Sequence, residues 1–134
     1  MASTVASEAV DILEAAGLGT PGTNLFEYRL PDTPHQAIAV IPYPGAQPMR
    51  HHGESVPGLQ QPRFQVRCRA TDDASVDDLA DRAFRALCAA MNRDVAPGVA
   101  WLAVRPLQDP FPQPEDQSRR MVRACNFEVL RRVA

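Results

Sequence analysis

Two hydrophobic patterns follow one another in the segment 62–91, first with a period of two and then with the period of a helix. Between Arg63 and Ala70, apolar side chains at even positions alternate with arginine or glutamine at odd positions. A period of two predicts a half-buried strand with one polar face. Turn-forming residues at 71–74 end this strand, and Ser75 stands where it could cap the helix that follows.

The helix predicted after Ser75 has one continuous apolar stripe that extends to Met91. Acidic side chains are concentrated in its early turns, where they suit the positive end of the helix dipole. Asp78–Arg82 and Asp81–Arg85 have the favourable i,i+4 spacing. Because burial of the stripe requires a partner surface, we expect the helix to pack on the apolar face of the preceding strand. The stripe consists of Val76, Leu79, Ala80, Ala83, Phe84, Leu87, Cys88 and Met91.

A first helix is predicted at residues 4–16, where apolar side chains form a narrow face. A hydroxyl at residue 3 or 4 can cap its start, and Gly17 is typical of a helix end closed by a left-handed glycine. The acidic side chains expected to face solvent are Glu8, Asp11 and Glu14.

Four more segments have the pattern of strands, at residues 25–30, 37–42, 99–107 and 121–133. The second of these is apolar on both faces, as expected of a central strand or of one that meets another subunit. The element order is helix, three strands, helix, two strands. We therefore predict a single α+β domain over residues 1–134, with a mainly antiparallel sheet of about five strands packed by two helices.

Two segments rich in proline have no period of either kind, at residues 43–61 and 108–118. A loop as long as the first is usually functional or disordered in a small domain. We expect residues 43–61 to form an exposed arm or binding loop, ordered by a neighbouring molecule.

Composition excludes several classes of function. The formal net charge of −2 gives no general reason to bind nucleic acid, although all 14 basic residues are arginines. The chain lacks a run of eighteen apolar residues, so no membrane span is expected. Acidic residues within the N-terminal apolar stretch argue against a signal peptide. The three cysteines have no paired spacing and fall on apolar faces, which indicates synthesis in a reducing cytoplasm.

Catalytic or metal-binding chemistry has little support. His51 and His52 lie near His35 and Glu54 in sequence, but adjacent side chains on extended chain point to opposite sides. Neither HExxH nor CxxC spacing accompanies them. The acidic pairs around Asp72 and Asp77 are explained by helix capping and lack the spacing of a calcium loop. We predict no enzyme activity, no metal and no cofactor.

Four strings in a fixed order carry a resemblance to a known family. They are LPDTPHQAIAVIPYPGAQP from residue 30, PRFQVRCRATD from 62, VRPLQDPF from 104 and RACNFEVLRR from 123. Together they resemble the tail terminator or minor capsid proteins of long-tailed bacteriophages (siphophages) and prophages. The resemblance extends over residues 30–130 and contains no catalytic signature.

The resemblance implies a structural virion protein at the head–tail junction, made in the host cytoplasm. Such a protein forms a homo-hexamer ring that caps the tail tube, stops its polymerisation and joins the tail to the head connector or stopper protein. DNA would pass through the lumen without specific binding, and the lumen should be neutral or acidic. Another head–tail joining protein, such as a stopper or connector adaptor, is the nearest alternative. A small-molecule-binding α+β domain is a more distant one.

Contacts with neighbouring subunits or partner proteins are predicted mainly in the two loops and on the polar strand face. Arg67 and Arg69 are expected to pair with acids of the next subunit and to set register. The strands at 37–41 and 121–133 are further candidate surfaces. The predicted contact residues are Tyr43, Pro44, Met49, Arg50, His51, His52, Glu54, Arg67, Arg69, Asp109, Phe111, Glu115 and Asp116.

Overall fold

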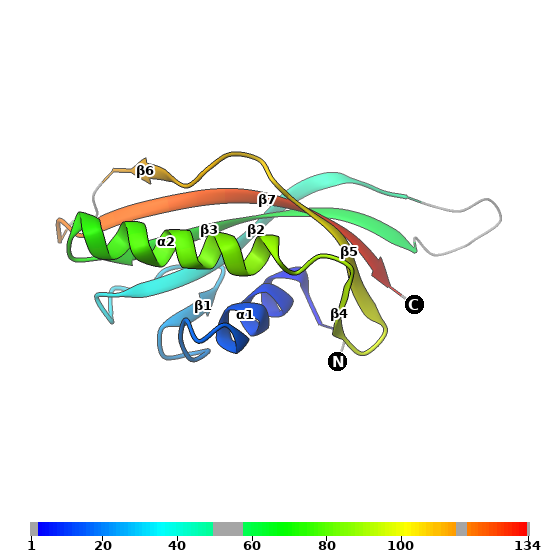
Figure 1. Cartoon of the computed structure of the whole chain (residues 1–134), viewed down its shortest axis with the longest axis horizontal. Helices are drawn as coiled ribbons and strands as arrows, with labels where there is room; N and C mark the ends of the chain where they lie inside the picture. Colours follow the sequence, from blue (N-terminus) through cyan, green and yellow to red (C-terminus); the bar gives the residue numbers. More distant parts are fainter. Residues whose placement is uncertain (1–2, 50–57, 115–117, 134) are drawn as a thin grey trace.

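The fold is a two-layer α+β arrangement, as predicted, in a computed structural model that describes residues 3–49, 58–114 and 118–133 (Figure 1). Within these ranges it contains more strands than predicted. The helices are α1 (Val5–Ala15) and α2 (Asp73–Cys88). The strands are β1 (Leu25–Glu27), β2 (Ala37–Met49), β3 (Leu59–Ala70), β4 (Arg93–Ala96), β5 (Val99–Pro106), β6 (Phe111–Gln113) and β7 (Met121–Val133).

One sheet contains all of these strands, in the order β1-β2-β3-β7-β5-β4, with β6 paired to β7. Neighbouring strands are antiparallel, except that β1 is parallel to β2. The long strands β2, β3 and β7 run side by side along the molecule (Figure 1). Because β7 has β3 on one side and β5 and β6 on the other, its edges are not available to another subunit.

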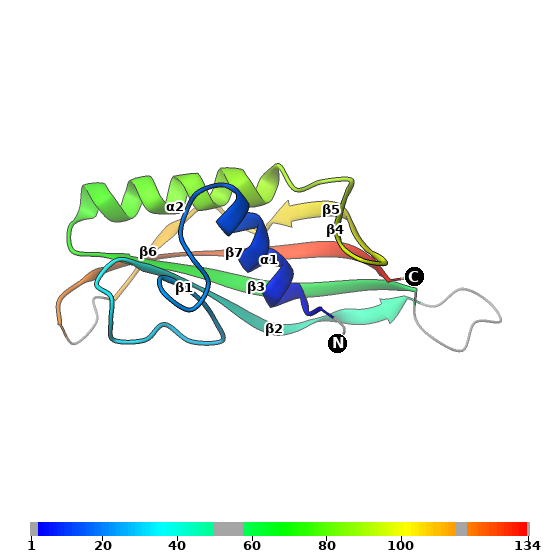
Figure 2. The same cartoon turned by 90° about the horizontal axis from the view of Figure 1, so that it is seen from below.

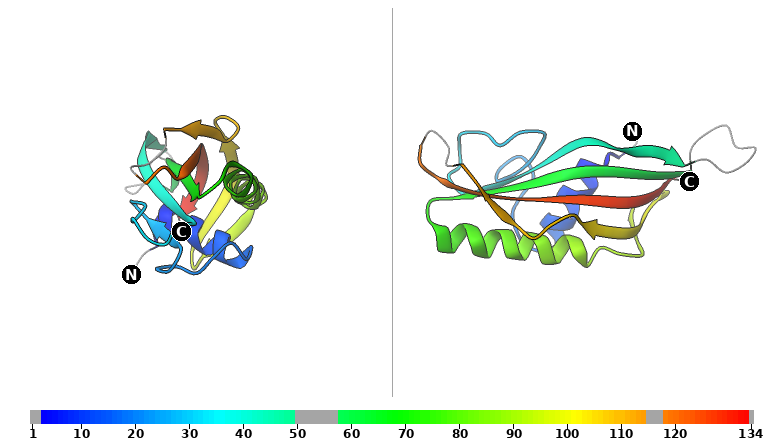
Figure 3. Two further views of the ribbon diagram at one scale, coloured as in Figure 1. Left: turned by 90° about the vertical axis from the view of Figure 1, so that its left-hand side faces the viewer. Right: turned by 90° about the horizontal axis from the view of Figure 1, so that it is seen from above.

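Both helices cover the same side of the curled sheet, which the end-on view shows (Figure 3, left). Seen from below, α1 crosses the sheet and α2 runs along the long strands (Figure 2). The even-numbered side chains of β3 face the helices, as the alternation predicts. Phe64 is fully buried there and stacks on Phe127 with ring centroids 5.4 Å apart, while its centroid lies 5.9 Å from that of Trp101. These aromatic rings form the centre of the core.

The apolar stripe of α2 is confirmed, but its start was predicted at the wrong residue. Asp72 is the N-cap, and its Oδ1 accepts a hydrogen bond from the backbone N–H of Ser75 at 2.7 Å. A carboxylate is a stronger acceptor than a hydroxyl, and it stands three residues earlier. The helix therefore begins and ends sooner than expected. Met91 lies beyond its end and is 51% exposed, whereas Leu87 is fully buried.

Helix α1 is also confirmed, with Thr4 as its N-cap and Gly17 at a φ of 80° after its end. The prediction that Glu8 faces solvent was wrong, since Glu8 has 0% exposure. Position 8 lies three residues after Val5 and four before Ile12, so helical spacing places it on the apolar stripe. Only the charge of Glu8 suggested solvent.

Arg131 of β7 is the partner that allows Glu8 to be buried. Its Nη2 lies 2.6 Å from Oε2 of Glu8, and its Nε donates to Oε1 at 2.9 Å. Trp101 of β5 donates its indole N–H to the same carboxylate at 2.9 Å, and the hydroxyl of Ser3 donates at 2.6 Å. Gln60 of β3 accepts from Arg131 at 2.7 Å. The network joins α1 to three strands that are distant in sequence.

The prediction of a structureless loop at residues 43–61 was wrong at both ends. β2 continues to Met49 and β3 begins at Leu59. The pairing of β2 with β3 shifts twice, between Tyr43 and Ala46 and between Ala46 and Met49, which disrupts the alternation expected of a strand. The expected ordering by a neighbour concerns mainly residues 50–57, which lie outside the described residues.

Prolines fit in β2 because they stand where no hydrogen bond to β3 is lost. Val40 accepts a hydrogen bond from the N–H of Tyr28, so the backbone groups of even-numbered residues in this part of β2 point away from β3. Pro42 shares this orientation, so its missing N–H group costs no hydrogen bond to β3, and Pro44 stands where the first register shift already interrupts the pairing with β3. Pro42 also makes the outer edge a poor template for pairing with another strand.

Two smaller predictions about the strands need correction. The strand expected at residues 25–30 ends at Glu27, because Tyr28 adopts a φ of 73°. The segment Ala37 to Val40 is apolar on both faces, but its side chains are at most 1% exposed within this chain. These residues therefore form part of the subunit's own interior, as expected of a central strand, and expose almost no side-chain surface to a neighbouring subunit. In the described part of the chain, no helix is long and apolar enough to cross a membrane.

Replacement of Leu87 by aspartate tests the packing of α2. A buried, unpaired carboxylate costs several kcal/mol against a total stability of about 5–15 kcal/mol, so Leu87→Asp should unfold the domain. Arg82→Ala, on the exposed side of the same helix, is the matched control and should be nearly silent. Thermal melts followed by circular dichroism measure both. An unchanged melting temperature for Leu87→Asp would disprove the packing.

Replacement of Glu8 by glutamine tests the buried network. Burial raises the pKa of Glu8, but the hydrogen bonds from Arg131, Ser3 and Trp101 outweigh it, and the pKa is lowered overall. Glu8→Gln leaves the guanidinium of Arg131 buried without a counter-charge, and we expect a loss of about 3–5 kcal/mol at pH 7. Glu14→Gln, on the exposed side of α1, should lose less than about 0.5 kcal/mol.

The difference in stability between wild type and Glu8→Gln should also depend on pH, in a direction set by the lowered pKa of Glu8. A carboxyl whose folded pKa is lowered contributes stability above its unfolded value of about 4.5, and this is lost as the pH falls through the folded pKa. The difference in unfolding free energy between wild type and Glu8→Gln should therefore shrink between pH 6 and pH 3. Denaturant titrations at both ends of this range measure it, and a difference that is constant or grows would contradict the ion pair.

Candidate interaction surface

The side of the sheet opposite the helices carries rows of polar side chains. We call this side of β2, β3, β7 and β5 the open face. In the view from above, the long strands lie in front of α1 (Figure 3, right). The odd-numbered side chains of β2 and β3 and the even-numbered side chains of β7 belong to it, because their neighbours in sequence form the core. The helices therefore leave this polar side of the sheet uncovered.

One row crosses the open face through Tyr43, Arg63, Glu128 and Arg105, which are paired in register on four adjacent strands. Arg63 donates its Nε–H to Oε2 of Glu128 at 2.7 Å, and Arg105 donates to Oε1 at 2.8 Å. The hydrogen bond from Arg63 and the charge of Arg105 lower the pKa of Glu128. Burial raises the pKa of Tyr43, despite the neighbouring charge of Arg63. The row is an ionic strip with one carboxylate between two guanidinium groups.

The next rows are linked by amides. Gln65 donates to Oδ1 of Asn126 at 3.3 Å. Arg67, predicted as a contact with another subunit, donates its Nε–H to Oε1 of Gln113 at 3.0 Å and is half-buried. The partner of Arg67 in this hydrogen bond is a neutral amide, so no carboxylate neutralises the guanidinium charge at this contact.

Arg69 has a different role from the one predicted. It is 3% exposed, and its guanidinium donates to the carbonyl of His35 at 3.0 Å, to that of Pro31 at 2.6 Å, and to that of Pro34. Arg120 binds the same loop, with Nη2 2.8 Å from Oδ1 of Asp32. Arg69 therefore holds the chain between β1 and β2 inside its own subunit. Alternation indicated which face of the strand Arg69 occupies, but not that a loop covers it.

The other predicted contact residues do not form one cluster. Pro44 is exposed in β2, and the backbone of Met49 pairs with Leu59 at the end of that strand. Asp109 is exposed between β5 and β6, and Phe111 begins β6 half-buried opposite Ala124. Tyr43, Arg67 and Arg69 lie on the open side of the sheet, where the loop between β1 and β2 covers Arg69. The predicted residues Arg50, His51, His52, Glu54, Glu115 and Asp116 lie outside the described residues.

Sequence reasoning missed the residues that connect the rows, namely Glu128, Arg105, Asn126 and Gln113. The period-two pattern of residues 121–133 placed Glu128 on the polar side, but the register between strands could not be derived from one strand alone. The pattern of one strand therefore predicts on which face of the sheet each side chain lies, but not which side chain of the adjacent strand it contacts.

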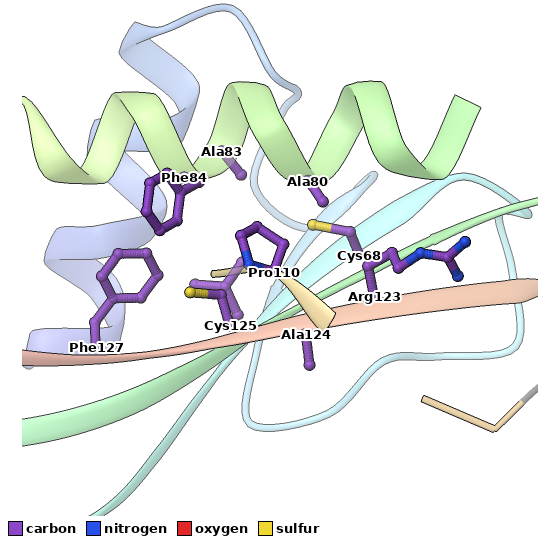
Figure 4. Close-up of a pocket in the computed structure, with 10 residues that line it drawn as sticks. Cys68, Ala80, Ala83, Phe84, Pro110, Arg123, Ala124, Cys125 and Phe127 are labelled. Carbon is purple, nitrogen blue, oxygen red and sulfur yellow. The ribbon is translucent and has the colours of Figure 1, made fainter. Parts of the chain in front are cut away.

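The cysteines lie where a core residue is expected. Burial raises the pKa of Cys68 and of Cys125 to about 12, so neither thiol forms the nucleophilic thiolate at neutral pH. Both line a small apolar pocket between α2, β3 and β7, together with Ala80, Phe84 and Phe127 (Figure 4). Its volume of about 10 Å³ is at the lower limit for holding a single water molecule and too small for a substrate.

Metal ligation finds no support in the residues that the structure places. In these parts of the chain, no group of three or more His, Cys, Asp or Glu side chains could hold an ion. The arrangement that remains is a broad polar surface on a rigid sheet, which suits association with another macromolecule.

Comparison with known proteins identifies the family. The family model described as bacteriophage tail terminator protein matches residues 12–131. Among curated proteins, no relative matches the chain. The matched region begins within α1 and ends within β7, so it contains α2, the strands β1 to β6 and all but the last two residues of β7. The chain therefore belongs to the bacteriophage tail terminator protein family, whose members are structural proteins.

Proposed function

We propose that this protein is the tail terminator of a long-tailed phage. In this role it forms a homo-hexamer ring on the last ring of the tail tube, stops polymerisation of the tube, and joins the tail to the head connector or stopper protein. DNA passes through the lumen. The observation that carries the proposal is the match of the family to residues 12–131, which is nearly the whole chain.

The fold supports ring formation through faces and not through strand edges. Pro42 removes an N–H donor from the outer edge of β2, and β7 is paired on both sides. The broad surfaces that remain are the helix layer and the open face, on opposite sides of the curled sheet. Contact between two different surfaces is heterologous and closes into a ring when the rotation between subunits is a simple fraction of a turn.

Loss of the protein tests this function in the phage that encodes it. A phage without a functional copy should produce tails of variable and excessive length that do not join to heads, because nothing stops the tube. Electron microscopy of lysates measures the length distribution. Addition of the purified protein during assembly should restore uniform tails, and addition of Leu87→Asp should not.

A different phenotype would contradict the terminator role. Tails of normal, uniform length that fail to join heads would assign the protein to another neck position, such as a stopper or connector adaptor. Normal particles would remove a head–tail joining role altogether.

A further inference from the structure

The two layers of the subunit carry opposite charge. The helix layer exposes more carboxylates than guanidinium groups on its solvent side. Its acidic residues are Asp11, Glu14, Asp73, Asp77, Asp78 and Asp81, and its basic residues are Arg82 and Arg85. Arg123 extends from β7 to Asp73 and Asp77 at 2.8 Å and neutralises only part of this charge.

The open face has the opposite balance. Its basic side chains with solvent access are Arg63, Arg67, Arg105 and Arg132, and the one acidic residue that β2, β3, β5 and β7 present there among the described residues is Glu128, with Asp94 of the edge strand β4 beside them. Glu128 is already shared between Arg63 and Arg105, and Arg105 remains 66% exposed. Arg132 follows Arg131 in β7, and because Arg131 faces α1, Arg132 lies on the open side. Positive charge therefore exceeds negative charge on this face.

The two charged surfaces cannot meet within one subunit, because the sheet separates them. Asp78 and Arg82 are 3.9 Å apart with both side chains more than half exposed, which is a weak pair. Asp11 and Glu14 are exposed on α1. The carboxylates of the helix layer are thus accessible to guanidinium groups of another molecule.

We propose that the open face of one subunit docks on the acidic helix layer of the next copy of this chain. The inference rests on the proposed ring and names its two contact surfaces. Charge complementarity favours a second copy over duplex DNA as the partner of the open face. The helix layer of a second copy offers carboxylates that match the arginines of the open face. DNA that approaches the subunit is repelled by the carboxylates of the helix layer. Opposite charges across such a contact also fix the register of the subunits.

Charge reversal on each surface tests the contact. The sheet variant is Arg105→Glu with Arg132→Glu, and the helix variant is Asp78→Arg with Asp81→Arg. All four side chains are exposed and their ion pairs lie at the surface, where each contributes about 0–1 kcal/mol, so both variants should remain folded. Each variant alone places like charges against each other and should weaken self-association by about tenfold or more, measured by sedimentation velocity. Arg93→Glu, exposed in the edge strand β4 and outside α2 and the four strands of the open face, adds no like charge to the contact and is the control, so it should not weaken association.

An equimolar mixture of the two variants gives the decisive result. The acidic open face of one variant then meets the basic helix layer of the other, and the unaltered surfaces of each also match. The mixture should associate within a few-fold of wild type, in rings where the two variants alternate. High salt should weaken wild-type association, because exposed charge pairs are screened.

Several results would overturn the inference. These are unchanged association of either variant alone, a mixture that stays dissociated, or wild-type protein that remains monomeric at every concentration. One further result would assign the open face to DNA. In that case wild-type protein binds duplex DNA, and the sheet variant no longer binds DNA but self-associates as wild type does. Tail length in the phage is a separate measurement, so the terminator role could stand while this contact fails, or fail while this contact stands.

Discussion

The buried contact between Glu8 and Arg131 is the constraint on which the arrangement of the layers depends. A charged carboxylate is tolerated in a protein interior only when a counter-charge and hydrogen bonds compensate for lost water. Here one guanidinium, one indole and one hydroxyl supply them, from β7, β5 and the chain before α1. Because a misplaced α1 would leave both charges buried and unpaired, the network selects one position of the helix on the sheet.

Arginine has two distinct uses on the other side of the same sheet. Arg69 is surrounded by loop carbonyls and is part of the subunit's interior. Arg63 and Arg105 share a single carboxylate and remain partly open to solvent. The planar guanidinium suits both roles, since its donors can satisfy several carbonyls or a carboxylate at once. The difference arises from what covers each position, and it leaves the open face with an excess of positive charge.

The outer edge of β2 and the two faces of the subunit together restrict how copies of this subunit can assemble. Pro42 on the outer edge of β2 opposes extension of the sheet, whose uncontrolled growth would produce aggregates. The faces are polar and oppositely charged, so association through them is directional and sensitive to salt. The ring that we propose needs a contact that closes and then stops, and a face-to-face contact between unlike surfaces can do so.

The sequence by itself determined the features that depend on local periodicity. The α+β class, the stripe of α2, the end of α1 at Gly17 and the polar face of β3 all follow from the spacing of side chains along one element. Only the tertiary structure decided which charges are buried, which strands are neighbours and where β2 ends. Glu8 and Arg69 depend on partners 123 and about 34–38 residues away along the chain, respectively. No spacing within one helix or strand encodes such a partner, because register between elements is set by the packing of the whole domain.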